Sequence, residues 1–267
     1  MGTISGSPIA ETVTKGAITI PLMKRAGFPG HIAGAIEAAA STGGAIMPPV
    51  MGAGAFIMSE MTGIPYVEII KVAAIPGILF FVSVGVMVYF ESRKLGIKGF
   101  AKEDLPRARD VWRKGWYLLL PIAVLIGVLV AGYSPQVAAL YGMVSTIAVS
   151  WFQVETRMGP AEIWQALVNA GKNCLFVAAL TGCVGVLIGV LSLTGIIIRF
   201  PYLLVELAGQ NILITIGLIA IATFVLGLPL PITATYLVVA VVAVPALLKL
   251  GVPMMSAHLL IFWLSLD

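Results

Sequence analysis

STGGAIMPP at residues 41–49 and GTISGSP at residues 2–8 are two helix-breaking stretches in an otherwise apolar chain. Backbone that leaves a helix inside a bilayer exposes N–H and C=O groups, which only protein or a water-filled cavity can shield. Membrane transporters place such interruptions near the membrane midplane, where they bind substrates and ions. The two stretches therefore predict a transport site.

The composition predicts an all-α polytopic membrane protein. Of the 267 residues, 60% are hydrophobic and 10% are charged, and the mean hydropathy is +1.05. A soluble domain has about 25% charged residues. The apolar runs are long enough for spanning helices and too long for barrel strands. The net charge of +4 does not indicate a nucleic-acid partner, because the basic residues cluster as loop charges do in membrane proteins.

The chain divides into three predicted regions. Residues 1–65 carry the second arm of a re-entrant hairpin and a broken helix, residues 66–210 carry spanning helices, and residues 211–267 carry a second hairpin and the start of a further helix. In the first region we expect an arm at 9–23 and half-helices at 30–41 and 50–62, on either side of the Gly-Gly and Pro-Pro segment. In the second region we expect spans at 66–91, 115–132, 135–152 and 173–196, a charged loop at 92–114, an amphipathic helix at 160–172 and a mixed segment at 197–209. In the third region we expect hairpin arms at 211–228 and 232–248.

The basic residues predict an orientation. Eight of the 16 Lys and Arg residues lie in the loop 92–114. If this loop is cytoplasmic, Lys24, Arg25, Arg157 and Lys172 fall on the same side, as the positive-inside rule requires. The first hairpin then enters the membrane from the cytoplasm and the second enters from outside.

The two hairpins also resemble each other in sequence. At a shift of 224 residues, matching pairs include Pro21 with Pro245, Gly27 with Gly251 and Pro29 with Pro253. Proline and glycine strongly influence the local backbone conformation, so these matches predict a repeated structure. Together with the opposite directions of entry, they predict an inverted-repeat transporter with two re-entrant hairpins and a broken helix. The partner of Pro48-Pro49 would follow Asp267, so we expect the chain to be a fragment of a longer protein.

The hairpin tips and the broken helix supply the candidate ion or substrate ligands. Hydroxyl and carbonyl oxygens of this kind suit a monovalent cation such as sodium, and nearby helix N-termini suit a carboxylate. The alternative is that these small residues only let helices pack closely. The candidates are Ser5, Gly6, Ser7, Thr42, Gly43, Gly44 and Pro48 in the first region, and Gly227, Thr233 and Thr235 in the second.

Other polar residues have a functional and a structural interpretation. Glu11 and Lys15 are spaced to pair on one helix face, and with Glu37 they are candidates because intramembrane charges are often functional. His31 and His258 favour structural roles over a proton relay. Cys174 and Cys183 are predicted to be buried core residues, with no metal-ligand spacing around them. No nucleophile–base arrangement or P-loop is found, so we expect neither an enzyme nor an ATPase.

At these motifs the chain resembles the large membrane subunit of TRAP transporters (DctM-like), most of all fused permeases of the TAXI type. The resemblance rests on GTISGS at 2–7, TIPLMKR at 19–25, EAAASTGG at 37–44, IMPPVMG at 46–52 and LGLPLPITATY at 226–236. It implies a sodium-coupled symporter that imports organic acids, including C4-dicarboxylates, by an elevator movement. It implies an extracytoplasmic solute-binding protein and a small membrane subunit as partners, in a bacterial or archaeal plasma (inner) membrane.

Two alternatives stay open. One is another inverted-repeat, ion-coupled carboxylate transporter that works without a binding protein. The other is a fragment that does not transport anything by itself. The sequence does not identify the solute, because specificity is expected largely from the separate binding protein.

Overall fold

The computed structural model describes residues 3, 6–97, 99–100, 108–153, 156–228 and 230–266, and in them it has helices and no strands. This confirms the all-α prediction. The chain forms two compact units. One holds residues 1–52 and 65–163, and the other holds residues 53–64 and 164–267.

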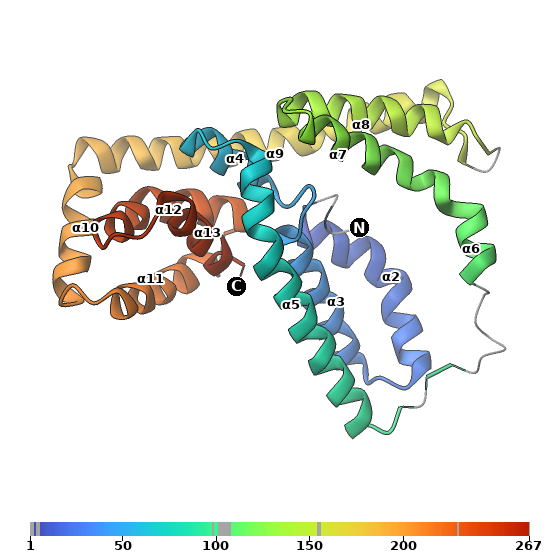
Figure 1. Ribbon diagram of the computed structural model, residues 1–267, viewed down its shortest axis with the longest axis horizontal. Coiled ribbons are helices and arrows are strands. Elements are labelled where there is room, and N and C mark those ends of the chain that lie inside the picture. The colour runs from blue at the N-terminus through green and yellow to red at the C-terminus, as the bar shows by residue number, and fades with distance from the viewer. Residues whose placement is uncertain are drawn as a thin grey trace. The chain divides into compact units, whose positions relative to one another are not determined.

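The first unit is built on three helices, α2 (Pro8–Ala26), α3 (Gly30–Ile46) and α5 (Tyr66–Lys94), which lie side by side in the order α2, α3, α5 (Figure 1). It continues with α6 (Ala108–Gly115), the 3-10 turn η2 (Trp116–Leu119), α7 (Leu120–Val130) and α8 (Pro135–Ser150). Helices α7 and α8 pack against each other as an antiparallel pair.

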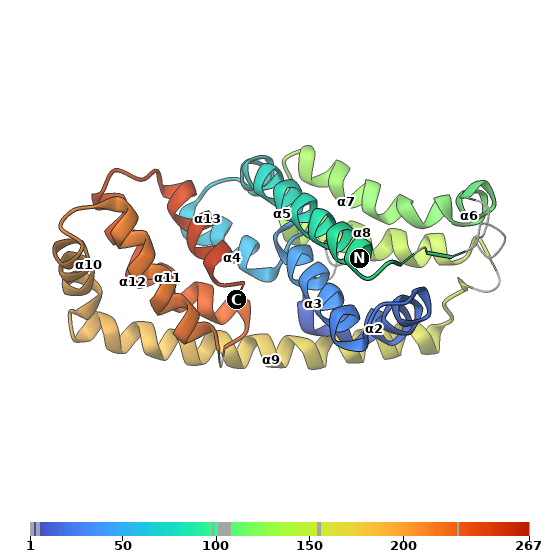
Figure 2. The same cartoon turned by 90° about the horizontal axis from the view of Figure 1, so that it is seen from below.

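The second unit contains α4 (Ala53–Thr62), α9 (Pro160–Leu193, whose first residues belong to the first unit), α10 (Ile196–Leu207), α11 (Ile212–Gly227), α12 (Ile232–Lys249) and α13 (Met254–Leu264). Helix α12 is central to it and contacts α4, α10, α11 and α13 (Figure 2). Tyr236 and Phe262 are fully buried between α12 and α13, and their rings meet edge to face at 5.5 Å between centroids.

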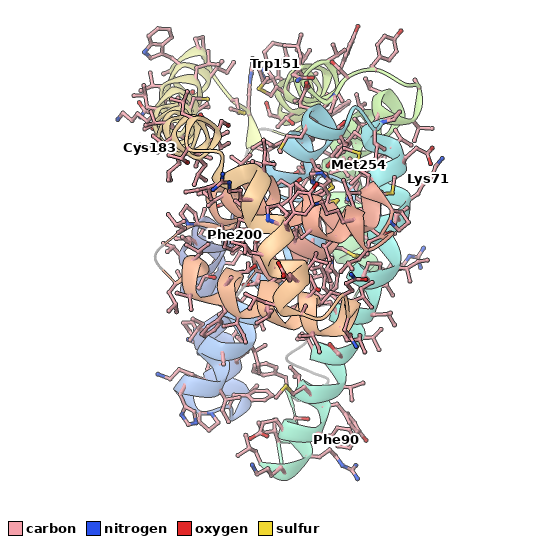
Figure 3. The ribbon with its side chains drawn as sticks, turned by 90° about the vertical axis from the view of Figure 1, so that its left-hand side faces the viewer. Lys71, Phe90, Trp151, Cys183, Phe200 and Met254 are labelled. Carbon is pink, nitrogen blue, oxygen red and sulfur yellow. The ribbon has the colours of Figure 1, made fainter. Side chains whose placement is uncertain are left out.

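In the described residues, two helices are long and apolar enough to cross a membrane, namely α5 and α12, and the bent pair Thr181–Leu193 and Ile198–Leu207 is a third if it counts as one span. The exposed side of α5 is apolar, as a lipid-facing surface requires, and Lys71 and Phe90 mark its two end regions (Figure 3). Helix α5 thus covers the predicted span 66–91 and has the length and composition that a span needs. Trp116–Val130, Ile212–Gly227 and Met254–Leu264 are shorter apolar helices.

The local structure repeats at the predicted shift of 224 residues. Helices α12 and α13 begin at Ile232 and Met254, which correspond to Pro8 and Gly30, the first residues of α2 and α3. Pro21 and Pro245 both lie inside their helices. The corresponding prolines Pro29 and Pro253 precede the next helix with nearly equal angles, φ −58°, ψ 146° and φ −58°, ψ 144°.

The turn between these helices is closed by the same hydrogen bonds in both copies. The Gly27 N–H donates to Lys24 O and the Gly251 N–H donates to Leu248 O, at 3.1 and 3.0 Å. Both glycines have positive φ, 110° and 82°, which is the conformation that ends a helix with a glycine. The repeat predicted from Pro and Gly is therefore present in the helix bounds and in the caps.

Several predicted boundaries are wrong. The loop 92–114 is helical at both ends, since α5 runs to Lys94 and α6 covers Ala108–Gly115. The amphipathic segment 160–172 and the span after it are one helix, α9, because no proline separates them and the helix tolerates the single Gly171. The mixed segment 197–209 is mostly helix α10, and Pro201 lies inside that helix.

Candidate ion-binding site

The break after α3 covers Met47–Gly52, which is later than predicted. Gly43 and Gly44 lie inside α3, and the expected separation of half-helices at residues 42–46 is wrong. Helix α3 ends where Pro48 and Pro49 follow, because proline has no N–H to donate and disfavours helical backbone in the residue before it. Three backbone bonds hold the break among the described residues: the Met47 N–H donates to Gly43 O at 3.1 Å, the Gly52 N–H donates to Ala45 O at 2.7 Å and the Val50 N–H donates to Thr3 O at 3.1 Å.

The tip at Gly6 packs backbone to backbone against this break. Gly6 has φ +62°, and a Cβ there would collide with the Met51 carbonyl oxygen and come within 2.8 Å of the Gly52 Cα. Glycine is therefore required by conformation and by space. Ser7 then starts α2, and its Oγ accepts a hydrogen bond from the Ala10 N–H at 3.4 Å. Ser5, predicted as a ligand, lies outside the described residues.

The structure thus brings Gly6 of the tip against the break, at the C-terminal end of α3, whereas Ser7 is exposed. Thr42 and Pro48 are half-buried near this end, and Gly43 and Gly44 are buried. The last carbonyls of a helix carry partial negative charge, which favours a cation. Backbone of the tip and backbone of the break therefore meet at this end of the helix, where the sequence predicts a cation site.

Helix α5 packs against the end of α3. A Cβ on Gly43 would collide with the Phe80 ring and come within 3.1 Å of Phe81. A Cβ on Gly77 of α5 would lie 3.0 Å from the Met47 Sδ. The packing interpretation therefore has direct support at Gly43, whereas the role of its oxygen in ion binding stays a prediction.

The charged residues lie between α2 and α3. Lys15 forms the ion pair with Glu11 that their spacing predicts. Glu37 is buried, and its Oε2 accepts a hydrogen bond from the Thr19 Oγ1 at 2.5 Å. Gly16 faces Glu37, since a Cβ there would be in ordinary contact with the Glu37 Cγ at 3.5 Å. The side chains thus stabilise the α2–α3 pair, and His31 is exposed at the start of α3.

The second tip is organised differently. The Leu230 N–H donates to Gly227 O at 3.2 Å, and the buried Thr235 hydroxyl reaches the carbonyls of Leu230 and Pro231 at 3.4 and 3.3 Å. Gly227 is buried and Thr233 is half-buried. The Thr235 hydroxyl therefore bonds to the backbone of its own tip. Asp267, which the repeat predicts to precede the partner of Pro48-Pro49, lies outside the described residues.

Some contacts could not be found from the sequence. The Tyr66 hydroxyl donates to the Val50 carbonyl oxygen and lies 3.4 Å from that of Pro49. In the second unit, the Tyr236 hydroxyl and the His258 Nδ1 are 2.8 Å apart and both side chains are buried, so His258 has the structural contact favoured over a proton relay. No spacing rule links residues this far apart along the chain.

The prediction for the two cysteines is wrong. Cys174 and Cys183 are exposed on α9, a helix that is apolar around most of its circumference, so its apolar residues do not mark a core (Figure 3). Among the described residues, no three His, Cys, Asp or Glu side chains gather as a metal site would require.

Comparison with known proteins is consistent with these motifs. Residues 1–266 match the model of the DctM component of tripartite ATP-independent periplasmic transporters. The chain is 23% identical, over 94% of its length, to a putative TRAP transporter large permease protein of Haemophilus influenzae and to the 2,3-diketo-L-gulonate TRAP transporter large permease protein of Escherichia coli. It is also 23% identical, over 93% of its length, to the isethionate TRAP transporter permease protein DctMQ of Oleidesulfovibrio alaskensis. The chain spans 59%, 59% and 39% of the lengths of these three relatives.

Proposed function

Because the chain belongs to the DctM family of tripartite ATP-independent periplasmic transporters, a family of transport permeases rather than enzymes, we propose that it forms part of a sodium-coupled permease for organic acids. The permease imports its solute across the plasma (inner) membrane of a bacterium or archaeon. It works with an extracytoplasmic solute-binding protein and with a small membrane subunit, which is separate or fused as in TAXI-type permeases.

One observation carries the sodium part of the proposal. The tip at Gly6 packs against the break Met47–Gly52 at the C-terminal end of α3, so backbone oxygens gather where the helix has its partial negative charge. Transporters coordinate sodium with such unwound carbonyls and half-helix C-termini. Sodium is a hard cation and prefers oxygen ligands of this kind.

The solute class rests on the relatives. Two of the relatives above are named for 2,3-diketo-L-gulonate and isethionate, and the sialic acid TRAP transporter permease protein SiaT of Haemophilus influenzae, 23% identical over 72% of this chain, is named for a third organic acid. The positive N-terminal end of α2, which begins beside the tip, suits an anionic group near the same region. We extend this to carboxylates in general, including C4-dicarboxylates.

The test is uptake by the full-length protein in proteoliposomes, with its solute-binding protein and small subunit. A panel of the three named acids and a C4-dicarboxylate is offered under an inward sodium gradient and under a matched potassium gradient. We expect uptake of at least one acid with sodium, and background uptake with potassium or without the binding protein. Equal uptake in both gradients would refute sodium coupling, and full uptake without the binding protein would favour a transporter that works alone.

A further inference from the structure

Tyr66 is a buried tyrosine at the first position of α5, directly after Pro65, which precedes the helix. Its side chain is 4% exposed. The hydroxyl donates to the Val50 carbonyl oxygen and lies 3.4 Å from the Pro49 carbonyl oxygen. Both acceptors lie in the middle of the break that the proposed sodium site uses. Tyr66 therefore connects the beginning of a spanning helix to the unwound backbone.

Main-chain bonds among the described residues fix the backbone of the break at three points, the first being the Met47 N–H that donates to Gly43 O. The Val50 N–H is held by Thr3 O and the Gly52 N–H by Ala45 O. With the Tyr66 hydroxyl, the peptide groups on both sides of Val50 are fixed. The carbonyls of Met47, Pro48 and Met51 take no part in these bonds, and that of Met51 lies beside Gly6.

We propose that the Tyr66 hydroxyl is a positioning group for the proposed sodium site: it orients the Met47–Gly52 break and so sets sodium affinity, without being a ligand itself. The inference rests on the proposed function. The hydroxyl proton is directed at protein carbonyls, so Tyr66 acts through the backbone. Without this bond the Val50 peptide group loses a partner on one side, and the neighbouring carbonyls of the break are held less firmly in the geometry that binds the ion.

The test replaces Tyr66 by Phe in the full-length protein, which removes one oxygen and keeps the buried ring. The control is Tyr117→Phe. Tyr117 is also buried in the first unit, and its ring lies against Phe152, 6.3 Å between centroids, instead of against the break. The purified proteins are melted in mixtures of NaCl and KCl at constant ionic strength. The dependence of the melting temperature on sodium concentration gives a Kd for sodium.

We expect Tyr66→Phe to raise the Kd for sodium about fivefold, the effect of losing one buried hydrogen bond, and Tyr117→Phe to leave it unchanged. An unchanged Kd in Tyr66→Phe would overturn the inference, even if the variant melts at a lower temperature in KCl. An equal rise in Tyr117→Phe would overturn it too, because the effect would not depend on the break.

Two further measurements separate the possible reasons for a negative result. If wild-type protein is stabilised equally by sodium and potassium, the proposed sodium site itself fails, and the role of Tyr66 fails with it. If Tyr66→Phe is recovered in low yield, radioactive sodium binding to membranes that contain the variant, normalised to the amount of protein, gives the same comparison of Kd values.

Discussion

At the residue scale, Gly6 is the position with the least freedom. Its φ of +62° and its contact with Met51 and Gly52 exclude any side chain. We predict that Gly6→Ala lowers the free energy of unfolding by about 1–3 kcal/mol and abolishes stabilisation by sodium, because the tip must withdraw from the break. The measurement is the melting temperature in NaCl and in KCl.

Gly96→Ala is the matched control for this substitution. Gly96 also has positive φ, +66°, but a Cβ there meets nothing within 4 Å. It is expected to show only the cost of the backbone conformation, about 1 kcal/mol, with the sodium response intact. A Gly6→Ala protein that keeps the wild-type sodium response would contradict the placement of the tip.

Thr19 gives a second residue-scale prediction. Its hydroxyl donates to the buried Glu37 carboxylate, and Val has the same shape without the donor. Thr19→Val is expected to cost about 1–3 kcal/mol, because a buried acceptor loses its hydrogen bond. Thr14→Val on the same helix removes a hydroxyl that bonds only main-chain oxygens at an exposed position, and it should change the melting temperature little. Equal effects of the two substitutions would argue against the Glu37 contact.

At the element scale, the crossing of α3 and α5 depends on Gly43. A methyl group there meets the Phe80 ring, so we predict that Gly43→Ala destabilises the protein by about 1–3 kcal/mol and that adding Phe80→Leu restores part of the loss. Gly34→Ala, in the same helix with nothing within 4 Å, should be neutral or slightly stabilising. The melting temperatures of Gly43→Ala, Phe80→Leu, the double variant and Gly34→Ala check this. Additive losses in the double variant would contradict it.

The elements also show what the sequence could and could not predict. Helix starts at Pro8, Gly30, Ile232 and Met254 follow from proline, glycine and serine signals, and the structure has helices there. The predicted helix break at Gly43-Gly44 is wrong, because glycine in a buried helix can allow close packing instead of breaking the helix. Which of the two applies depends on the facing residue, Phe80, and this is a tertiary contact that no local pattern contains.

At the scale of the whole molecule, the repeat could be predicted because proline and glycine fix the backbone whatever surrounds them. The polar side-chain contacts of one copy could not be predicted from those of the other copy. The Thr19–Glu37 bond of the first copy has no equivalent in the second, where Ala243 and Ile261 occupy the corresponding positions and Tyr236 bonds to His258 instead. Equivalent backbones thus carry different polar contacts, which only the packed structure reveals.

The contact between Tyr236 and His258 leads to a prediction for the second unit. His258→Phe leaves the Tyr236 hydroxyl buried without its partner, so we expect a loss of about 1–3 kcal/mol in stability. The double variant Tyr236→Phe with His258→Phe should be less destabilised than the sum of the single variants, because neither polar group then remains buried. Melting curves of the three variants test this, and strictly additive losses would contradict the pair. The sodium Kd should stay as in wild type, since the proposed site uses the first unit.

The most direct test of the central claim is equilibrium binding of radioactive sodium to the purified full-length protein, wild type and Gly6→Ala, in excess potassium. We predict saturable binding to the wild type that potassium does not displace, and binding at least tenfold weaker in Gly6→Ala. Absence of saturable binding in the wild type, or equal binding in both proteins, would contradict a sodium site formed by the tip and the Met47–Gly52 break.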